Sequence, residues 1–284
     1  MSTQSESTIS PKIAKRILEI FPEGAVFFDL ETTGLSPLFE KIVEFAGIKI
    51  SSKGVEVFQT LINPEKEMLE RIIEIHGITN EMVSNAPTEA EISPKIIDFI
   101  GELPLIAHNA KFDIGFLICL QRRQQQDLKD NKVYCSCTLS RKINKNANSH
   151  KLSMLSEQFE IALDQHHRAL DDTKACLEVF YHLSKMNENT NEIRSNSYLF
   201  SLNDFTTDKN VFIPSHLSLL ETLVPQGKEM EIKYKGGSKS GEYRPIKPIS
   251  VLPLPDGDVL YAFCLNSKLH KFYKLKKITE VRER

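Results

Sequence analysis

The chain has 284 residues, of which 40% are hydrophobic and 26% are charged, and its formal net charge is −2. These values indicate a globular protein of one or two domains and exclude a disordered or fibrous chain. No apolar run approaches the ~20 residues of a membrane span, and the polar N-terminus lacks a signal-peptide pattern. We therefore expect a cytoplasmic protein with no membrane partner.

The first two thirds of the chain alternate between strand and helix patterns. Apolar residues with a helical period cover 11–21, and strand composition marks 25–30, 42–50 and 55–63, which are expected to form an antiparallel meander. The remaining predicted elements are helices at 68–79, 88–103, 112–126, 150–161 and 170–186, a strand at 104–109, and a strand-to-helix segment at 133–143. Pro94 is expected near the first turn of its helix. This alternation indicates a layered α/β domain over 1–186.

The last third of the chain differs in composition and charge. Residues 187–214 are rich in Asn, Ser and Thr and are predicted to be a polar linker, with a short helix at 217–224 after it. Four or five short strands separated by Gly-rich turns then predict a small all-β barrel or sandwich over 215–284. This segment holds 13 Lys and Arg against 8 Asp and Glu, a surplus of +5, while 1–214 carries −7. The asymmetry favours a polyanionic partner near the C-terminal part.

Asp29 and Glu31 interrupt the apolar strand in "AVFFDLETTG". Because side chains alternate along a strand, both carboxylates project from one face at its end. Two acids this close repel, and one would be forced to protonate unless cations lie between them. A pair of solvated acids on an edge strand is the alternative, which the flanking "AVFF" disfavours. The pattern therefore predicts a cation-binding site.

Two later segments carry further candidate residues. Asp113 lies in "AHNAKFDIGFL" at a predicted helix start, where an acid also has the ordinary role of complementing the helix dipole. The segment "HHRALDDTKA" at 166–175 opens the last helix of the domain with two histidines and two aspartates, which could equally be capping and surface residues. Each segment is weak evidence alone, and the ordered set of three carries the prediction.

Together these segments resemble the DEDDh 3'–5' exonucleases, the family of polymerase proofreading subunits and related RNases. The matching motifs are "FFDLETTGL", "IAHNAKFDIGFL" and "HHRALDDTKA", and the resemblance covers roughly 25–183. It implies an RNase H-like mixed sheet flanked by helices. It also implies that the catalytic and metal-binding acids are Asp29, Glu31, Asp113 and Asp172. By the family spacing the general base is His167 rather than His166, which leaves Asp171 as an outward-facing or capping residue.

The resemblance also implies the chemistry. Two divalent cations, Mg²⁺ or Mn²⁺, suit an all-carboxylate site and phosphodiester hydrolysis. Asp29 is expected to bridge both ions, and a histidine with an ordinary pKa of about 6.5 can accept a proton at neutral pH. The expected products are nucleoside 5'-monophosphates released from single-stranded DNA or RNA. Expected substrate-binding residues are Thr32, Thr33, Gly34, Leu35, His108, Asn109 and Phe112.

Residues 215–284 resemble a WYL domain, the small Sm-like barrel of many bacterial regulators, although the namesake tripeptide is absent. The resemblance rests on "LLETLVPQGKEMEIKYKG", "EYRPIKPISVLPLPDGDVLYAFCLN" and "FYKLKKITEV". Basic and aromatic residues there are expected to bind nucleic acid or a ligand: Lys233, Tyr234, Arg244, Lys247, Tyr273, Lys274 and Lys277. A purely structural cap is the alternative for this domain.

Three interpretations of the whole chain follow. The first is a 3'–5' exonuclease for single-stranded nucleic acid. The second is an oligoribonuclease-like enzyme for short RNAs or dinucleotides, and the third is a sensor built on the WYL-like domain. A homodimer is a further possibility that the sequence leaves open.

Overall fold

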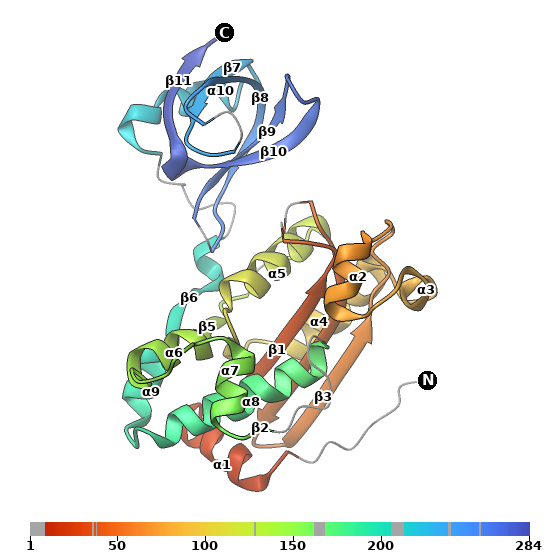
Figure 1. Cartoon of the computed structure of the whole chain (residues 1–284), viewed down its shortest axis with the longest axis vertical. Helices are drawn as coiled ribbons and strands as arrows, with labels where there is room; N and C mark the ends of the chain where they lie inside the picture. The colour runs from red at the N-terminus through yellow and green to blue at the C-terminus, as the bar shows by residue number, and fades with distance from the viewer. Residues whose placement is uncertain are drawn as a thin grey trace. The chain divides into compact units, whose positions relative to one another are not determined.

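The computed structural model describes residues 9–35, 37, 39–127, 129–161, 168–205, 213–237, 240–255 and 257–284. The chain divides into two compact units, Met1–Asn203 and Asp204–Arg284 (Figure 1). Within the described ranges, every helix is too short or too polar to span a bilayer.

The first unit is built on a six-stranded mixed sheet with the strand order β3-β2-β1-β4-β5-β6. Its strands are β1 (Ala25–Thr32), β2 (Ile42–Ser51), β3 (Gly54–Leu61), β4 (Leu105–Ala107), β5 (Lys132–Cys135) and β6 (Tyr198–Ser201). Strands β1 to β3 pair antiparallel, as the meander prediction required. Strands β1, β4 and β5 pair parallel, and β6 closes the edge antiparallel. The predicted α/β fold with a mixed sheet is confirmed.

The helices described in this unit are α1 (Pro11–Ile20), α2 (Glu70–His76), α3 (Asn80–Val83), α4 (Glu89–Ile100), α5 (Lys111–Arg123), α6 (Ser136–Ile143), α7 (Leu152–Gln158), α8 (Ala169–Lys185) and α9 (Thr190–Ser197). Local sequence sets several of their ends. Thr88 and Glu91 form a capping box at the start of α4, and Gly77 ends α2 with a positive φ of 71°. Pro94 lies in the interior of α4 rather than near its first turn, so the prediction of its position was wrong.

Both faces of the central strands are covered by helices. On one face, Phe27 of β1 packs edge-on against Phe180 of α8, with ring centroids 5.6 Å apart. On the other face, Phe45 of β2 meets Phe99 of α4 at 6.3 Å, so α8 and α4 lie on opposite sides of the sheet (Figure 1). Burial of these aromatic side chains stabilises the sheet and holds β1 rigid between two layers. Asp29 and Glu31 continue the Phe27 face of this strand.

Residues 187–203 differ from the linker that their composition predicts. They contain α9, whose Ile193 is fully buried in the main core, and β6, which pairs with β5. The side chain of Asn189 accepts hydrogen bonds from the backbone N–H groups of Asn191 and Glu192 and so caps α9. Asn189 therefore caps a helix, a role that composition alone does not distinguish from that of a linker residue.

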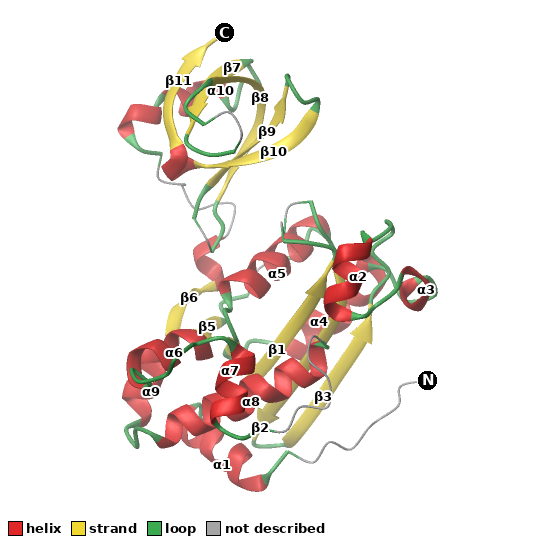
Figure 2. Ribbon diagram, in the orientation of Figure 1, coloured by secondary structure: helices red, strands yellow, loops and turns green. Residues whose placement is uncertain are grey.

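The second unit contains a five-stranded, all-antiparallel sheet with the order β10-β9-β8-β7-β11 (Figure 2). Its strands are β7 (Met230–Tyr234), β8 (Tyr243–Leu252), β9 (Val259–Cys264), β10 (Leu269–Lys274) and β11 (Ile278–Glu283). The short helices in this part are η1 (Leu202–Phe205), which begins in the first unit, η2 (Ser215–Leu217), α10 (Leu219–Leu223) and η3 (Leu275–Lys277). Leu217, Leu220 and Leu223 pack into one apolar core with inward-facing residues of the strands. The predicted all-β character of this segment is confirmed.

Candidate active site

A cluster of carboxylates lies where β1 ends. Asp29 and Glu31 share one face of the strand, and Asp172 comes from the first turn of α8, which packs on that face. Carboxylate oxygens of these three residues all lie within 4.8 Å of one another. Residues more than 140 positions apart in sequence thus converge because a helix is packed against the central strand.

Asp113 completes the cluster from the first turn of α5, where it is only 3% exposed. Hydrogen bonds from its own backbone N–H and from the backbone of Leu30 hold its carboxylate at β1. Asp113 is also close enough to Asp29 and Asp172 for electrostatic repulsion between them. The structure therefore brings together all four acids that the sequence singled out.

The cluster carries strongly perturbed acidities. Burial, followed by repulsion from Asp113 and Asp172, raises the pKa of Asp29 well above its ordinary value. Burial and the neighbouring acids raise the pKa of Glu31 to about 8, and burial raises that of Asp113 to about 8. Among the described residues, no lysine or arginine forms a salt bridge with these three acids. An all-oxygen set of buried, mutually repelling acids fits hard divalent cations such as Mg²⁺ and Mn²⁺.

The last residue of β1 and the loop after it contain the four residues expected to contact the terminal nucleotide. Thr32 donates its hydroxyl hydrogen bond to the carbonyl of Gly34 (2.8 Å), so this side chain tightens the turn. The Thr33 hydroxyl donates to Glu40 (2.5 Å) and accepts from the backbone N–H of Lys41 (3.0 Å). The side chain of Leu35 is 85% exposed. Both threonine side chains therefore shape the loop, and Leu35 projects from it.

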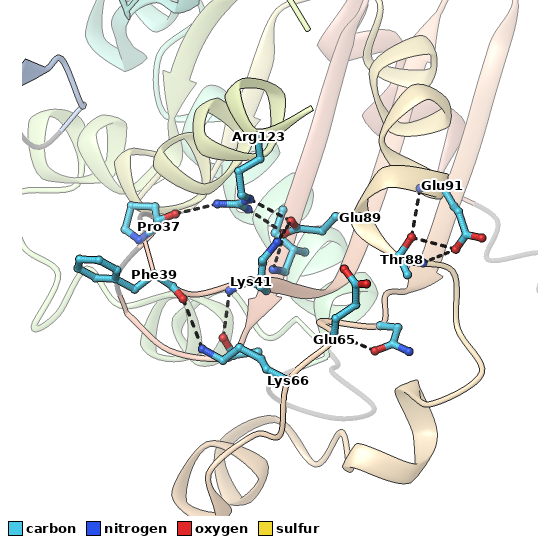
Figure 3. Close-up of polar contacts among 12 residues, drawn as sticks. Pro37, Phe39, Lys41, Glu65, Lys66, Thr88, Glu89, Glu91 and Arg123 are labelled. Carbon is cyan, nitrogen blue, oxygen red and sulfur yellow. Dashed lines mark hydrogen bonds and ion pairs between the residues drawn. The ribbon is translucent and has the colours of Figure 1, made fainter. Parts of the chain in front are cut away.

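A buried glutamate that sequence reasoning missed anchors this loop (Figure 3). Glu89, the first residue of α4, is 2% exposed and accepts hydrogen bonds from Lys41 Nζ (2.8 Å) and from Arg123 Nε and Nη2 (3.0 and 2.8 Å). Arg123 also donates from Nη1 to the carbonyl of Pro37 (3.1 Å). In the sequence, Glu89 is indistinguishable from an ordinary acid at a helix start, so no local signal reveals this role.

On the outer side of the same loop, Lys66 donates to Glu40 (2.6 Å) and to the Phe39 carbonyl (3.4 Å). Figure 3 shows the contact between Lys66 and the Phe39 carbonyl below those of Glu89. The loop is thus tied to three separate parts of the first unit: α4, α5 and the segment before α2.

Both ring nitrogens of His108 form hydrogen bonds within the protein. Its Nε2 lies 2.9 Å from the carbonyl of His150, which can only accept, so Nε2 carries the proton. Its Nδ1 then accepts from the hydroxyl of Ser136 at 2.8 Å. Burial lowers the pKa of His108 to about 4, which keeps the ring neutral. Both ring nitrogens are committed within the fold, so His108 does not offer substrate a hydrogen bond.

The other predicted residues of the first unit have different environments. Asn109 is exposed, with a left-handed φ of 60°, and half-buried Phe112 packs against Phe116 at 5.1 Å. Asp171 forms an ion pair with Lys174 (3.3 Å), in line with its expected place outside the cluster. His167, the expected general base, lies outside the described residues.

In the second unit, several predicted binding residues are already engaged. Tyr273 is 2% exposed and packs against Tyr234 at 5.1 Å, so its ring is core and cannot stack on a base. Lys233 forms an ion pair with Glu280 (2.8 Å). Arg244 lies over the Tyr234 ring at 5.2 Å and donates to the carbonyl of Gly236. Sequence composition did not reveal these internal partners.

The remaining predicted residues of that unit lie nearer the surface. Lys247 and Lys277 are exposed, and Lys274 is half-buried. Lys247 and Lys277 are therefore the exposed members of the predicted set, and buried Tyr273 is the member least open to a polyanion.

A mixed sheet covered by helices, with clustered carboxylates at the end of its central strand, fits a nuclease-type hydrolase, and the family comparison supports this class. The chain belongs to the exonuclease family: the model of that family, of RNase T type, matches residues 26–180. This places it in the superfamily of DEDD-type 3'–5' exonucleases.

Its curated relatives are much longer proteins. DNA polymerase III PolC-type from Staphylococcus epidermidis is 34% identical over 199 residues, which are 69% of this chain and 14% of the polymerase. The protein of the same name from Bacillus subtilis is 35% identical over 219 residues, which are 75% of this chain and 15% of the polymerase. The chain therefore spans about one seventh of the length of these relatives.

Solved structures share the fold at low identity. E. coli exonuclease I in complex with a dT13 oligonucleotide superposes with a TM-score of 0.56 at 16% identity, covering 92% of this chain and 66% of that chain. A second exonuclease I structure gives a TM-score of 0.54 at 18% identity, covering 85% of this chain and 55% of that chain.

Proposed function

We propose that the chain is a metal-dependent 3'–5' exonuclease of the DEDDh type that degrades single-stranded nucleic acid to nucleoside 5'-monophosphates. The observation that carries the proposal is the acidic cluster, in which Asp29, Glu31 and Asp172 oxygens lie within 4.8 Å, inside the region matched by the exonuclease family. The exonuclease I relatives, solved with dT13 and dA16 oligonucleotides, support a single-stranded substrate.

The donor set fits divalent cations. Asp29, Glu31 and Asp172 would hold them, with Asp113 contributing from α5. When bound, two Mg²⁺ or Mn²⁺ ions stabilise charge on the attacking and leaving oxygens of a phosphodiester. The fit rests on the chemistry of the site, because uncompensated carboxylates with raised pKa values gain most from a cation that replaces their protons.

The other residues of the site have positioning and proton-transfer roles in this proposal. His167 accepts the proton of the attacking water, since a histidine is the side chain that titrates near neutral pH. Backbone groups from Thr32 to Leu35 hold the terminal nucleotide, and Phe112 contributes an aromatic surface for a base. The contacts of Glu89 with Arg123 and Lys41 support this loop by fixing it to α4 and α5.

The C-terminal unit is proposed to be a WYL-like, Sm-like barrel that binds the nucleic acid. Its all-antiparallel sheet and the +5 charge surplus of 215–284 support this role. Exposed Lys247 and Lys277 are the residues on which phosphate contact would rest.

The test is a product ladder. Single-stranded DNA, single-stranded RNA and dinucleotides, each 5'-labelled, are incubated with the full chain and Mn²⁺, and the products are resolved over time. We expect progressive shortening from the 3' end, release of 5'-monophosphates, and no turnover by Asp29→Asn. Turnover of dinucleotides alone would replace the proposal with the oligoribonuclease-like activity. No Mn²⁺-dependent cleavage of any substrate would overturn it.

A further inference from the structure

Glu44 is a fully buried carboxylate beside the acidic cluster. It lies on β2 directly opposite Glu31 of β1 in the antiparallel register, and its exposure is 0%. A carboxylate removed from water is costly unless charged and hydrogen-bonding partners compensate it. The partners of Glu44 therefore show what this position does.

Those partners come mainly from the start of α8. Arg168 donates from Nε to Oε2 (3.1 Å) and from Nη2 to Oε1 (2.8 Å) of Glu44. This bidentate contact fixes the orientation of the guanidinium plane. The backbone N–H of Ala169 donates to Oε2 (3.1 Å), and Gln59 Nε2 donates to Oε1 (2.9 Å). Each oxygen of Glu44 thus accepts two hydrogen bonds, and a carboxylate has about four acceptor sites. Glu44 has no acceptor site left for a metal ion.

The contact with Ala169 gives α8 its N-terminal cap. The first N–H groups of a helix lack partners within the helix, and Arg168 at the N-cap position provides no side-chain hydrogen bond. Glu44 fills this role from a neighbouring strand, and its negative charge also complements the positive end of the helix dipole. The N-terminus of α8 is therefore fixed to β2 rather than capped by its own sequence.

A second contact fixes the rotation of the helix. The single hydroxyl proton of Thr173 is shared between the carbonyl of Ala169 (2.6 Å) and, more weakly, the carbonyl of Ala46 on β2 (3.3 Å). Glu44 and Ala46 are two residues apart on one strand, and they hold α8 on either side of Asp172. With both contacts in place, the helix cannot turn about its axis without moving Asp172 away from Asp29 and Glu31.

We propose that Glu44 is a positioning residue of the metal site, which orients Asp172 through the start of α8 and holds Arg168 beside the acidic cluster. Because the proposed exonuclease function supplies the metal site, this inference rests on that function. Arg168 pairs with Glu44 and also lowers the pKa of Glu31, so it offsets part of the repulsion that Glu44 exerts on Asp29 and Glu31. Groups that orient metal ligands typically contribute roughly 10–100-fold to metal affinity or activity.

The test compares two buried glutamates of the same unit. Glu44→Gln replaces one acceptor oxygen by an amide that faces donors, and Glu89→Gln makes the same change at the Arg123 pair, away from α8. Isothermal titration with Mn²⁺ on the full chain is expected to show roughly 10–100-fold weaker binding for Glu44→Gln. Glu89→Gln is expected to retain the wild-type Mn²⁺ affinity, although both variants lose thermal stability.

Kinetics and a milder variant separate positioning from folding. Glu44→Gln is expected to lower kcat at fixed Mn²⁺ with little change in the KM for an oligonucleotide, and Glu44→Asp is expected to recover part of the loss. Thr173→Val removes only the second anchor, keeps the side-chain volume, and is expected to weaken Mn²⁺ binding severalfold. It provides the test if Glu44→Gln does not fold.

Wild-type Mn²⁺ affinity in folded Glu44→Gln, or in Thr173→Val if Glu44→Gln does not fold, would overturn the inference. Loss of Mn²⁺ affinity in Glu89→Gln equal to that in Glu44→Gln would overturn it too, because the effect would then be general destabilisation. Failure of the exonuclease proposal looks different: the wild-type chain itself would then show no Mn²⁺-dependent cleavage.

Discussion

Glu89 and the acidic cluster at the end of β1 lie in the same unit, but Glu89 forms salt bridges with two cations and three acids of the cluster form none with the described residues. Glu89, which is 2% exposed, is held between Lys41 and Arg123. Asp29, Glu31 and Asp113 have no salt-bridge partner among the residues that the structure describes, and their pKa values are raised. A buried carboxylate with salt-bridge partners stabilises the fold, whereas buried carboxylates with raised pKa values and no such partners are suited to binding a cation.

Burial and mutual repulsion make Asp29, Glu31 and Asp113 destabilising when they are ionised without a bound cation. Their repulsion and desolvation oppose folding and must be offset by the packed layers on both faces of β1. Such local repulsion is a physical signature of a functional site, because Arg168, the cation that interacts with Glu31, makes its salt bridge with Glu44 and not with the cluster.

The largest expected effect comes from removing one charge of the cluster. Asp29→Asn is expected to lower the rate of oligonucleotide hydrolysis by at least about a thousandfold. The same change is expected to raise the melting temperature of the metal-free protein at pH 8, because it removes a buried ionisable group and its repulsion with Asp113 and Asp172. Hydrolysis assays and thermal melts in EDTA measure the two effects.

The sign of the pH dependence follows from linkage. A carboxyl group whose folded pKa is raised binds protons in the folded state that the unfolded chain has released. Metal-free wild-type protein should therefore lose stability as the pH rises from about 4, through the ordinary acid range, towards 8, where Glu31 titrates. Asp29→Asn should show a shallower decline, and Mn²⁺ should restore stability to wild type more than to the variant. An unchanged or lower melting temperature of the metal-free variant at pH 8 would break the comparison.

The opposite outcome is expected at Glu89. Removing one partner of a buried ion pair typically costs about 3–5 kcal/mol. Because Lys41 and Arg123 are 26% and 24% exposed, water can reach the cations left behind, so we expect Glu89→Ala to cost about 3 kcal/mol, the low end of that range. Urea denaturation at pH 7 measures this loss.

The neighbouring helix-cap acid provides the matched control. Glu91, two residues further along α4, is exposed, and within the described ranges its side-chain hydrogen bonds are those of its capping box with Thr88 (Figure 3). Glu91→Ala should cost clearly less than Glu89→Ala. Equal losses would show that the stabilisation by Glu89 comes from its position at the helix start and not from its ion pairs.

Features set by neighbouring residues could be predicted from the sequence, whereas features set by distant partners could not. Asp29 and Glu31 were predictable because strand alternation and an apolar flank act locally, and the motifs around Asp113 and Asp172 added the rest. Glu44 and Glu89 were not, because their partners lie 124 and 34 residues away and their local sequences are those of an ordinary strand and helix start. The segment 187–203 was missed for a similar reason, since the burial of Ile193 depends on packing and not on composition.

His108 is a buried base whose pKa, like the pKa values of the buried acids, is shifted by burial towards the neutral form. Burial lowers its pKa to about 4, while an unfolded histidine titrates near 6.5. The unfolded chain therefore binds more protons in this window, and His108 makes the protein lose stability as the pH falls from about 6.5 towards 4. Urea denaturation at pH 7, 6 and 5 should show His108→Asn less stable than wild type at pH 7, through loss of the contacts with Ser136 and His150, with the difference shrinking at lower pH. A difference that stays constant with pH would contradict a buried neutral ring.

The smallest effect is expected at an exposed pair in the second unit. Lys233 bonds to Glu280 at 2.8 Å, but their side chains are 36% and 50% exposed, so water screens the attraction. Lys233→Ala should leave the thermal stability of the full chain within measurement error, in contrast to Glu89→Ala, although both variants break a pair of equal length. The two pairs differ chiefly in burial, and a clear loss in Lys233→Ala would show that the neighbouring contact of Lys233 with the Tyr243 ring, and not the ion pair, carries energy at this site.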